Sequence, residues 1–323
     1  MKLWLLLLAL PLFAETRTHF FSADEQGRSE VLWEELSCSP FKELTLSWNA
    51  SRPSAGRYSF FISVRQNGEW SPWLYYAEWG SQGQIMFKDI PEHSCAFAQG
   101  GQVKPKVGFC DGYRVKVEGS GGADLGRFYH LSVCTLDHFR ASQRQEPLAF
   151  VLLEGVPRFS QLMTRHPRHY DLALPTAMAA LVGYCVGEKV VSPVEFAEKV
   201  IDDDTAFYEN VSFNIAQASH YLNGAYLELS HLPDFAALHA YLIKGYPQIA
   251  FISGYFPGCP RSYQTEHAVC VIGYDPNENR VHCIDSGFPI DQNTLTSYSL
   301  PDFLRGWAKQ RNKAIILRPL RNP

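Results

Sequence analysis

The sequence predicts two domains of different fold class, an all-β, sandwich-like domain over residues 15–145 and an α+β domain over residues 146–323. Three observations predict this division. The chain has 323 residues, more than a single hydrophobic core usually serves. Short alternating apolar segments fill the chain up to about residue 140, and helical periodicity begins after Pro157. In the second part helices precede strands, an order typical of an α+β domain.

Composition and charge exclude several other classes of protein. The hydrophobic fraction is 46% and the charged fraction 19%, which indicates a folded protein and not a disordered one. The net charge is −4, and without a cluster of Lys and Arg we expect no nucleic-acid partner. No closely spaced cysteine pair suggests a zinc site, so we expect neither metal nor cofactor. The acidic run 202–204 is expected at a solvated helix end, and nothing indicates the oligomeric state.

The first 14 residues have the pattern of a secretory signal peptide. Lys2 supplies the positive charge, residues 3–13 are continuously apolar, and Ala14 is a small residue suited to cleavage. This stretch is shorter than the ~20 residues that span a membrane, and no second hydrophobic run follows that could anchor the chain. We therefore expect an exported protein, periplasmic or secreted, without an integral membrane span. An uncleaved N-terminal strand or a membrane anchor is the alternative interpretation.

Export bears on the cysteines, which divide evenly between the two halves of the chain. An oxidising compartment would allow them to pair, and even numbers suit bridges within each domain. Their connectivity stays open. The cysteines are Cys38, Cys95, Cys110, Cys134, Cys185, Cys259, Cys270 and Cys283.

The N-terminal part predicts a series of short strands with turns between them. Asn67-Gly68 between two apolar runs is a strong signal for a hairpin. Several aromatic residues follow this turn, and we favour a place for them in the sandwich core, with stacking on a sugar or peptide as the alternative. These aromatic residues are Trp70, Trp73, Tyr75, Tyr76 and Trp79. The expected strands are residues 44–48, 58–64, 70–76, 113–117 and 129–134.

The C-terminal part predicts helices and then an antiparallel sheet. Residues 175–186 are apolar nearly all round, so this helix is expected to be buried, with Pro175 at its first position and Gly187 after its end. Ser192 and Glu195 form a capping box that opens a second helix, to about residue 201. Further helices are expected at 212–223, 233–244 and 301–308, and strands at 149–153, 248–253, 267–274, 280–285 and 314–317.

One pair of residues in the C-terminal part has the spacing of a catalytic pair. A cysteine hydrolase needs a thiolate at a helix N-terminus, a histidine, a group that orients the histidine, and an oxyanion donor. His267 begins an apolar strand, and Asp285 ends the strand that follows after a tight turn. In such a hairpin the two side chains lie near the same end, while the helix that opens at Pro175 is the natural place for a nucleophile.

Four segments of the chain together resemble the C39-like family of cysteine peptidases. They are Gly155-Val-Pro-Arg-Phe-Ser-Gln161, Ala173-Leu-Pro-Thr-Ala-Met178, Glu266-His267-Ala-Val-Cys-Val-Ile-Gly-Tyr-Asp275 and the following strand that ends at Asp285. The resemblance covers about residues 150–320 and implies a papain-like fold. Residues 41–49 and 70–73 also resemble the β-rich domain that often precedes this module in exported bacterial proteins.

The resemblance assigns roles residue by residue. It implies that Gln161 is the oxyanion-hole glutamine, His267 the general base and Asp285 the residue that orients it. The nucleophilic cysteine of the family falls on Ala173, which carries no thiol. A natural loss of the cysteine and an engineered Cys→Ala exchange are both compatible with the sequence.

Another cysteine could in principle replace the missing thiol. Cys185 lies three helical turns beyond Ala173, and Cys270 faces away from His267 because neighbouring strand positions alternate. Cys259 lies on a loop before the histidine strand and could approach the cleft. We expect a catalytically inactive homologue that binds peptide or a peptide-like ligand. The alternatives are an active peptidase or amidase that uses Cys259, and a non-catalytic protein-interaction module.

Overall fold

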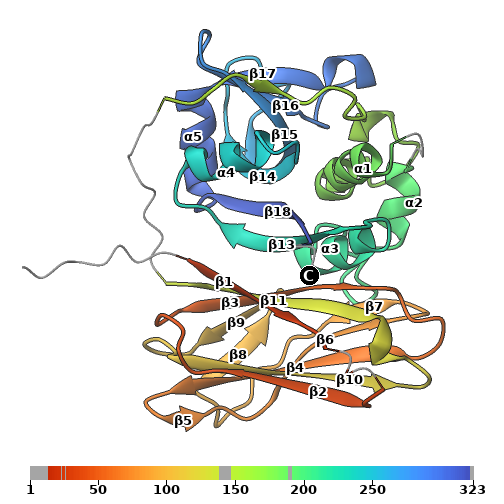
Figure 1. The fold of residues 1–323 in the computed structure, drawn as a ribbon, viewed down its shortest axis with the longest axis vertical. Coiled ribbons are helices and arrows are strands. Elements are labelled where there is room, and N and C mark those ends of the chain that lie inside the picture. The colour runs from red at the N-terminus through yellow and green to blue at the C-terminus, as the bar shows by residue number, and fades with distance from the viewer. Residues whose placement is uncertain (1–13, 23, 26, 138–146, 188–190, 321–323) are drawn as a thin grey trace, which may run out of the picture.

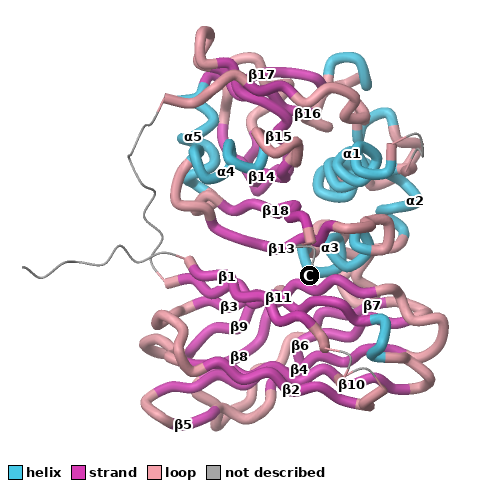
Figure 2. The backbone as a smooth tube through the Cα atoms, in the orientation of Figure 1, coloured by secondary structure: helices cyan, strands magenta, loops and turns pink. Residues whose placement is uncertain are grey.

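The computed structural model describes residues 14–22, 24–25, 27–137, 147–187 and 191–320, so nearly all of the expected signal peptide lies outside the described residues. The chain forms two stacked regions (Figure 1). The N-terminal region contains two β-sheets, and the C-terminal region contains a third sheet with helices around it. All described α-helices belong to the C-terminal region (Figure 2), and the structure as a whole is mostly β.

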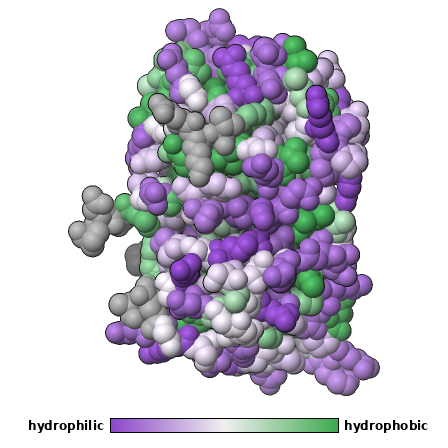
Figure 3. Space-filling model, turned by 90° about the vertical axis from the view of Figure 1, so that its right-hand side faces the viewer, coloured by the Kyte–Doolittle hydropathy of each residue, from purple (hydrophilic) through white to green (hydrophobic). Residues whose placement is uncertain are grey.

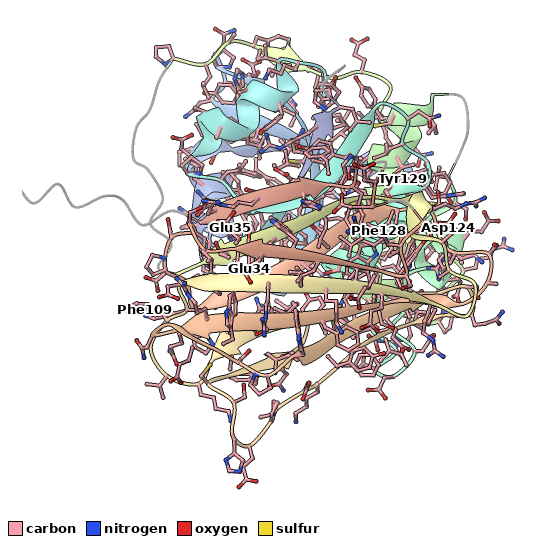
Figure 4. All side chains as sticks on the ribbon, turned by 60° about the horizontal axis from the view of Figure 1, so that its bottom comes forward. Glu34, Glu35, Phe109, Asp124, Phe128 and Tyr129 are labelled. Carbon is pink, nitrogen blue, oxygen red and sulfur yellow. The ribbon has the colours of Figure 1, made fainter. Side chains whose placement is uncertain are left out.

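The N-terminal region consists of two antiparallel sheets. The first sheet contains, in spatial order, β1 (Glu15–Phe20), β11 (Phe128–Leu136), β3 (Glu43–Ala50), β9 (Gln102–Pro105) and β8 (Ala96–Gln99). The second contains β2 (Glu30–Glu35), β10 (Gly112–Ser120), β4 (Arg57–Gln66), β6 (Leu74–Gly80) and β7 (Gln84–Met86), with β5 (Glu69–Trp70) paired to β4. In Figure 4, Tyr129 lies where β11 approaches the C-terminal region, and Phe109 lies at the opposite end of the sheets.

The predicted hairpin is confirmed, but the strand after it is interrupted. Arg65 pairs with Trp70, and Asn67 and Gly68 have φ angles of 54° and 84° in the turn. Such positive φ values suit Asn-Gly. The expected strand 70–76 breaks between β5 and β6 around Pro72, which has no N–H to donate to a neighbouring strand.

The aromatic residues after the hairpin divide between two environments. Tyr76 and Trp79 are fully buried in the core, as predicted. The core prediction is wrong for Trp70, Trp73 and Tyr75, which are only partly buried. Alternate strand positions face opposite sides of the sheet, so part of this series must point outward. The guanidinium of Arg114 lies 4.7 Å and 4.6 Å from the ring centres of Trp70 and Trp73.

The C-terminal region packs helices against an antiparallel sheet, as predicted. Its sheet has the order β13 (Ala225–His231), β18 (Lys313–Pro319), β14 (Gln248–Gly254), β15 (Tyr263–Asp275), β16 (Arg280–Ile284) and β17 (Leu295–Ser299), with β12 (Val151–Leu152) paired to β15. The helices are α1 (Ala173–Val186), α2 (Pro193–Glu198), α3 (Val211–Ser219), α4 (Phe235–Leu242) and α5 (Leu300–Lys309).

Two element boundaries differ from the prediction in ways that matter for the site. Helix α1 begins at Ala173, so Pro175 is its third residue and not its first. Strand β15 begins at Tyr263 because Tyr263 still pairs with Gly254 of β14. His267 therefore lies inside a strand and not at its start. Ser192 is the N-cap of α2, as predicted, since the Glu195 N–H donates to Ser192 Oγ at 3.3 Å.

The two regions share a continuous buried core. The ring centres of Trp48 on β3 and Phe213 on α3 are 5.9 Å apart, and both side chains are fully buried. The side-chain amide of Asn49 bonds both backbone groups of Leu227 on β13, at 2.7 and 2.9 Å. The face in Figure 3 is predominantly hydrophilic across its middle, where the regions meet.

The acidic run 202–204 takes part in this contact between the regions, contrary to the expectation of a solvated helix end. Asp202 is only 1% exposed and accepts the Met86 N–H at 2.8 Å. Asp203 accepts the Gln84 N–H at 2.8 Å. The loop between α2 and α3 is thus attached to β7 by charge-assisted hydrogen bonds.

All eight cysteines are free thiols in this structure. Within the described residues, no helix is long and apolar enough to cross a bilayer. The same part of the chain contains no group of three or more His, Cys, Asp or Glu side chains that could hold a metal ion.

Candidate active site

The centre of the candidate site is a hydrogen-bonded pair, His267 and Asp285. His267 Nε2 lies 2.8 Å from Asp285 Oδ1. His267 projects from β15, and Asp285 directly follows β16, the neighbouring strand. The imidazole is 4% exposed and the carboxylate is completely buried. The hairpin of these strands therefore brings the two predicted side chains together.

Asp285 accepts hydrogen bonds from three further donors. Tyr263 and Tyr298 donate their hydroxyls to Oδ2 at 2.7 and 2.6 Å, and the Gly287 N–H donates to Oδ1 at 2.9 Å. Burial alone would raise the Asp285 pKa, but the charge of His267 and these side-chain hydrogen bonds outweigh it and hold the pKa below its usual value. Asp285 is thus an ionised acceptor, which keeps a proton on His267 Nε2.

Tyr263 also fixes the plane of the imidazole. Its ring stacks on His267 with centroids 3.8 Å apart and an angle of 8° between the planes. Burial and the charge of Asp285 raise the Tyr263 pKa, so its hydroxyl remains a donor. The histidine is thus held by a hydrogen bond at one edge and by a ring against one face.

Gln161 is fully buried behind the site, and its side-chain amide is already bonded on both ends. Its Nε2 donates to the carbonyl oxygens of His169 and Tyr170, both at 3.1 Å. Its Oε1 accepts the Ser286 hydroxyl at 2.8 Å, and its backbone N–H donates to the Ser286 carbonyl at 2.9 Å. In this arrangement both amide hydrogens are directed at backbone carbonyls, and Gln161 connects the segment before α1 with the residue after Asp285.

Ala173 is the first residue of α1 and is 3% exposed. The residue before it, Leu172, provides no side-chain cap to the helix. A helix N-terminus without a cap leaves N–H donors that attract negative charge, and this is the feature that would lower the pKa of a thiol there. At this position the chain has only a methyl group.

Glu209, which the sequence analysis did not single out, accepts a hydrogen bond from the first turn of α1. Glu209, from the loop before α3, accepts the Leu174 N–H at 3.2 Å. Burial raises the Glu209 pKa to about 7, against the lowering effects of the Leu174 hydrogen bond and the charge of His267. Glu266 and Asp171 raise it further. Glu209 is therefore bonded to the first turn of α1 and also interacts with the charge of His267.

The segments that lead into α1 and β15 also touch each other. The Arg261 guanidinium lies 5.1 Å from the centre of the Tyr170 ring. Tyr170 belongs to the 3₁₀ turn η3 (His169–Asp171), directly before the helix, and is 60% exposed. This contact joins the segment before α1 to the segment before β15.

Cys185, Cys259 and Cys270, which the sequence analysis considered as possible nucleophiles, lie in different environments. Cys259 is partly buried, and its Sγ accepts the Phe256 N–H at 3.3 Å within the turn 256–259. Cys270 is completely buried, and burial raises its pKa far above the usual value. Burial likewise raises the pKa of Cys185 to about 11. The raised pKa values of Cys185 and Cys270 disfavour the thiolate that a nucleophile needs.

The residues missed by sequence reasoning differ in how well they could have been found. Tyr263 is four positions before His267, which puts both on one face of a strand, so a longer predicted strand would have included it. Tyr298 lies on β17, a strand that was not predicted. Glu209 comes from a loop 36 positions after Ala173, and no local pattern marks it.

The fold and the His267–Asp285 pair together define a peptidase-like protein. A model of the Peptidase_C39 like family matches residues 153–315. The chain belongs to this family, as the resemblance of its motifs indicates. No match to the chain was found among curated proteins, and none among solved structures.

Proposed function

We propose that the protein is an exported, catalytically inactive member of this family that binds a peptide or peptide-like ligand in a retained cleft. In this proposal the C-terminal region is papain-like, and the N-terminal region is a sandwich-type domain fused to it. The observation that carries the proposal is the combination at the helix end. Ala173 occupies the nucleophile position, while the His267–Asp285 pair keeps its 2.8 Å hydrogen bond.

The absence of catalysis follows from the chemistry of the position. A methyl group cannot attack a carbonyl, and loss of the nucleophile in a catalytic triad typically costs several orders of magnitude in rate. Cys259 is held in a turn by the Phe256 N–H. The Gln161 amide has no hydrogen left for an oxyanion, because both are bonded to backbone carbonyls.

Retention of a binding site is supported by how completely the polar groups around His267 are satisfied. Every oxygen of Asp285 is hydrogen-bonded, and such networks hold side chains in one arrangement. The protein also has a cavity of about 600 Å³, a size typical of ligand sites, whose wall includes Glu209 and Glu266, the residue before His267. Export is inferred from residues 1–14 alone and implies ligands outside the cytoplasm.

The proposal is tested with the full chain in two measurements. The first is labelling with a thiol-directed suicide probe, and the second is fluorescence anisotropy with a library of short peptides. We expect no labelling that depends on His267, and weaker peptide binding by His267→Ala than by the wild type. His220→Ala, at the exposed end of α3, is the matched control and should bind like the wild type.

Two results would contradict the proposal. Labelling that disappears in His267→Ala would identify an active enzyme with a displaced thiol, and Cys259→Ser would then show whether that thiol is Cys259. An absence of peptide binding in every variant would leave a protein-interaction role for the two regions and remove the peptide-binding role.

A further inference from the structure

The cavity that Glu209 lines is formed by residues of both regions of the chain. The N-terminal region contributes β7 and the turn between β8 and β9, with Met86 and Gly101 on the wall. The C-terminal region contributes the loop before α3, including Glu209 and Asn210, and Glu266, the neighbour of His267. Its volume of about 600 Å³ could enclose a short peptide segment. The N-terminal region thus forms part of the wall of the cavity that Glu209 lines.

Most charged groups on the wall of this cavity are paired within the protein. Glu43 is 2.8 Å from Arg311, and Glu266 is 2.7 Å from Lys313. Asp202 accepts hydrogen bonds from the Met86 N–H and from Thr205. These groups have partners and do not need a ligand to balance their charge.

Glu209 is different, because no cation lies within ion-pair distance of it among the described residues. Its one described hydrogen bond comes from the Leu174 N–H and occupies Oε1. Asp171 and Glu266 act on the carboxyl with the same sign of charge, and His267 acts with the opposite sign when protonated. A half-buried carboxylate that lacks a counter-charge is costly, and a ligand that brings a cation would remove this cost.

We propose that this cavity binds a primary ammonium group of a peptide and that the Glu209 carboxylate is its ionic partner. This proposal rests on the peptide-binding function given above and specifies the ligand. A metal ion is a poorer fit, because the described residues contain no cluster of ligating side chains. Guanidinium prefers both oxygens of a carboxylate, whereas an ammonium group needs one, and Oε1 is already occupied.

The proposed pair predicts a particular dependence on pH. Glu209 must be ionised to bind a cation, and its pKa of about 7 means that affinity rises between pH 6 and pH 8. Asp171, Glu266 and His267 are the charged or titratable groups that act on Glu209, from η3 and β15. An α-ammonium group loses its proton at about pH 8 and a lysine side chain at about pH 10.4. Affinity for the first therefore falls again above pH 8, and affinity for the second does not.

The test is isothermal titration calorimetry of the full chain with three tetra-alanine peptides, all amidated at the C-terminus. One has a free N-terminus, one is N-acetylated, and one is N-acetylated with lysine at the second position. We expect the acetylated peptide without lysine to bind at least about 30-fold more weakly than the better of the two ammonium peptides at pH 7.5. The pH profile of that better peptide then identifies the source of the ammonium group.

Two variants assign the effect to Glu209. In Glu209→Gln, which retains an oxygen for the Leu174 N–H, the preference for ammonium and the rise in affinity from pH 6 to pH 8 should both disappear. Glu278→Gln makes the same exchange in the exposed turn between β15 and β16, outside the cavity, and should weaken binding less than about threefold. Thermal unfolding of each variant checks that it is folded.

The outcomes separate this inference from the function it rests on. If all three peptides bind equally, or if Glu209→Gln keeps the ammonium preference, the ammonium site is wrong and peptide binding stands. If no peptide binds to the wild type, both proposals are wrong.

Discussion

Among single residues, Asp285 combines complete burial with an ionised state, and four hydrogen bonds hold it there. Its donors come from β15, from β17 and from the turn that Asp285 itself begins. Removing the charge of a buried, paired group leaves its partners unsatisfied. We expect Asp285→Asn to lower the free energy of unfolding by about 3 to 5 kcal/mol at pH 7, measured by urea denaturation.

The Asp285 network also predicts a direction for the pH dependence of stability. The folded-state pKa of Asp285 lies below its usual value, which is about 3.9 in unfolded chains. Its contribution is therefore complete above the unfolded pKa and is lost as the pH falls through the folded pKa. The difference in unfolding free energy between wild type and Asp285→Asn should shrink between pH 5 and pH 3. A difference that grows over this range would contradict the assigned charge state.

A cysteine introduced at position 173 would lie close to Glu209, and we expect Glu209 to lower the reactivity of its thiol. The N-terminus of α1 favours the thiolate, but the negative charge of Glu209 at Leu174 opposes it. We expect Ala173→Cys to react slowly with iodoacetamide at pH 8. The double variant Ala173→Cys/Glu209→Gln should react about tenfold faster, because one pKa unit changes the thiolate fraction by about that factor. Equal rates would show that Glu209 does not act on position 173.

At the scale of elements, sequence patterns predicted the parts of the site that belong to regular strands and helices. The hairpin of β15 and β16 had to bring His267 towards Asp285, since an apolar strand, a tight turn and a second strand leave little freedom. The buried character of α1 was equally clear from its composition. A loop has no periodicity from which the position of a side chain can be predicted, and the sequence analysis therefore missed Glu209.

The position of Gln161 illustrates a second limit of sequence reasoning at this scale. The motif placed Gln161 before the helix, and the structure does have it fully buried there. The direction of its amide depends on two carbonyl oxygens in η3 and on the Ser286 hydroxyl. Such contacts depend on how separate loops pack together, which no periodicity in the sequence encodes.

The contact between β3 and β13 across the two regions predicts a large effect of one buried side-chain amide. Asn49 bonds both the N–H and the carbonyl of Leu227. Asn49→Ala leaves both groups buried without a partner, so we expect a loss of about 2 to 3 kcal/mol in urea denaturation. Ser51→Ala removes an exposed hydrogen bond to Tyr129 and should change stability by no more than about 0.5 kcal/mol. Similar effects of the two variants would argue against a rigid contact at β13.

At the scale of the whole molecule, the N-terminal and C-terminal regions have separate sheets but share a buried core. Trp48 contacts Phe60 of the opposite sheet, at 4.1 Å between ring centres, as well as Phe213 of α3. Ser219 Oγ bonds both backbone groups of Ala50, each at 3.1 Å. Because one buried cluster extends through both regions, neither can unfold without exposing apolar surface of the other.

This shared core predicts that the two regions unfold together. Differential scanning calorimetry of residues 14–320 should give a single transition whose calorimetric and van't Hoff enthalpies agree. Phe213→Ala tests the cause, because it removes the ring that α3 packs against Trp48 and should lower the transition temperature without dividing the transition. Two separate transitions in the unsubstituted chain would mean that the regions are thermodynamically independent. The cavity between them would then open by motion of one region against the other, and the affinity of a peptide at Glu209 would include the free energy of closing it.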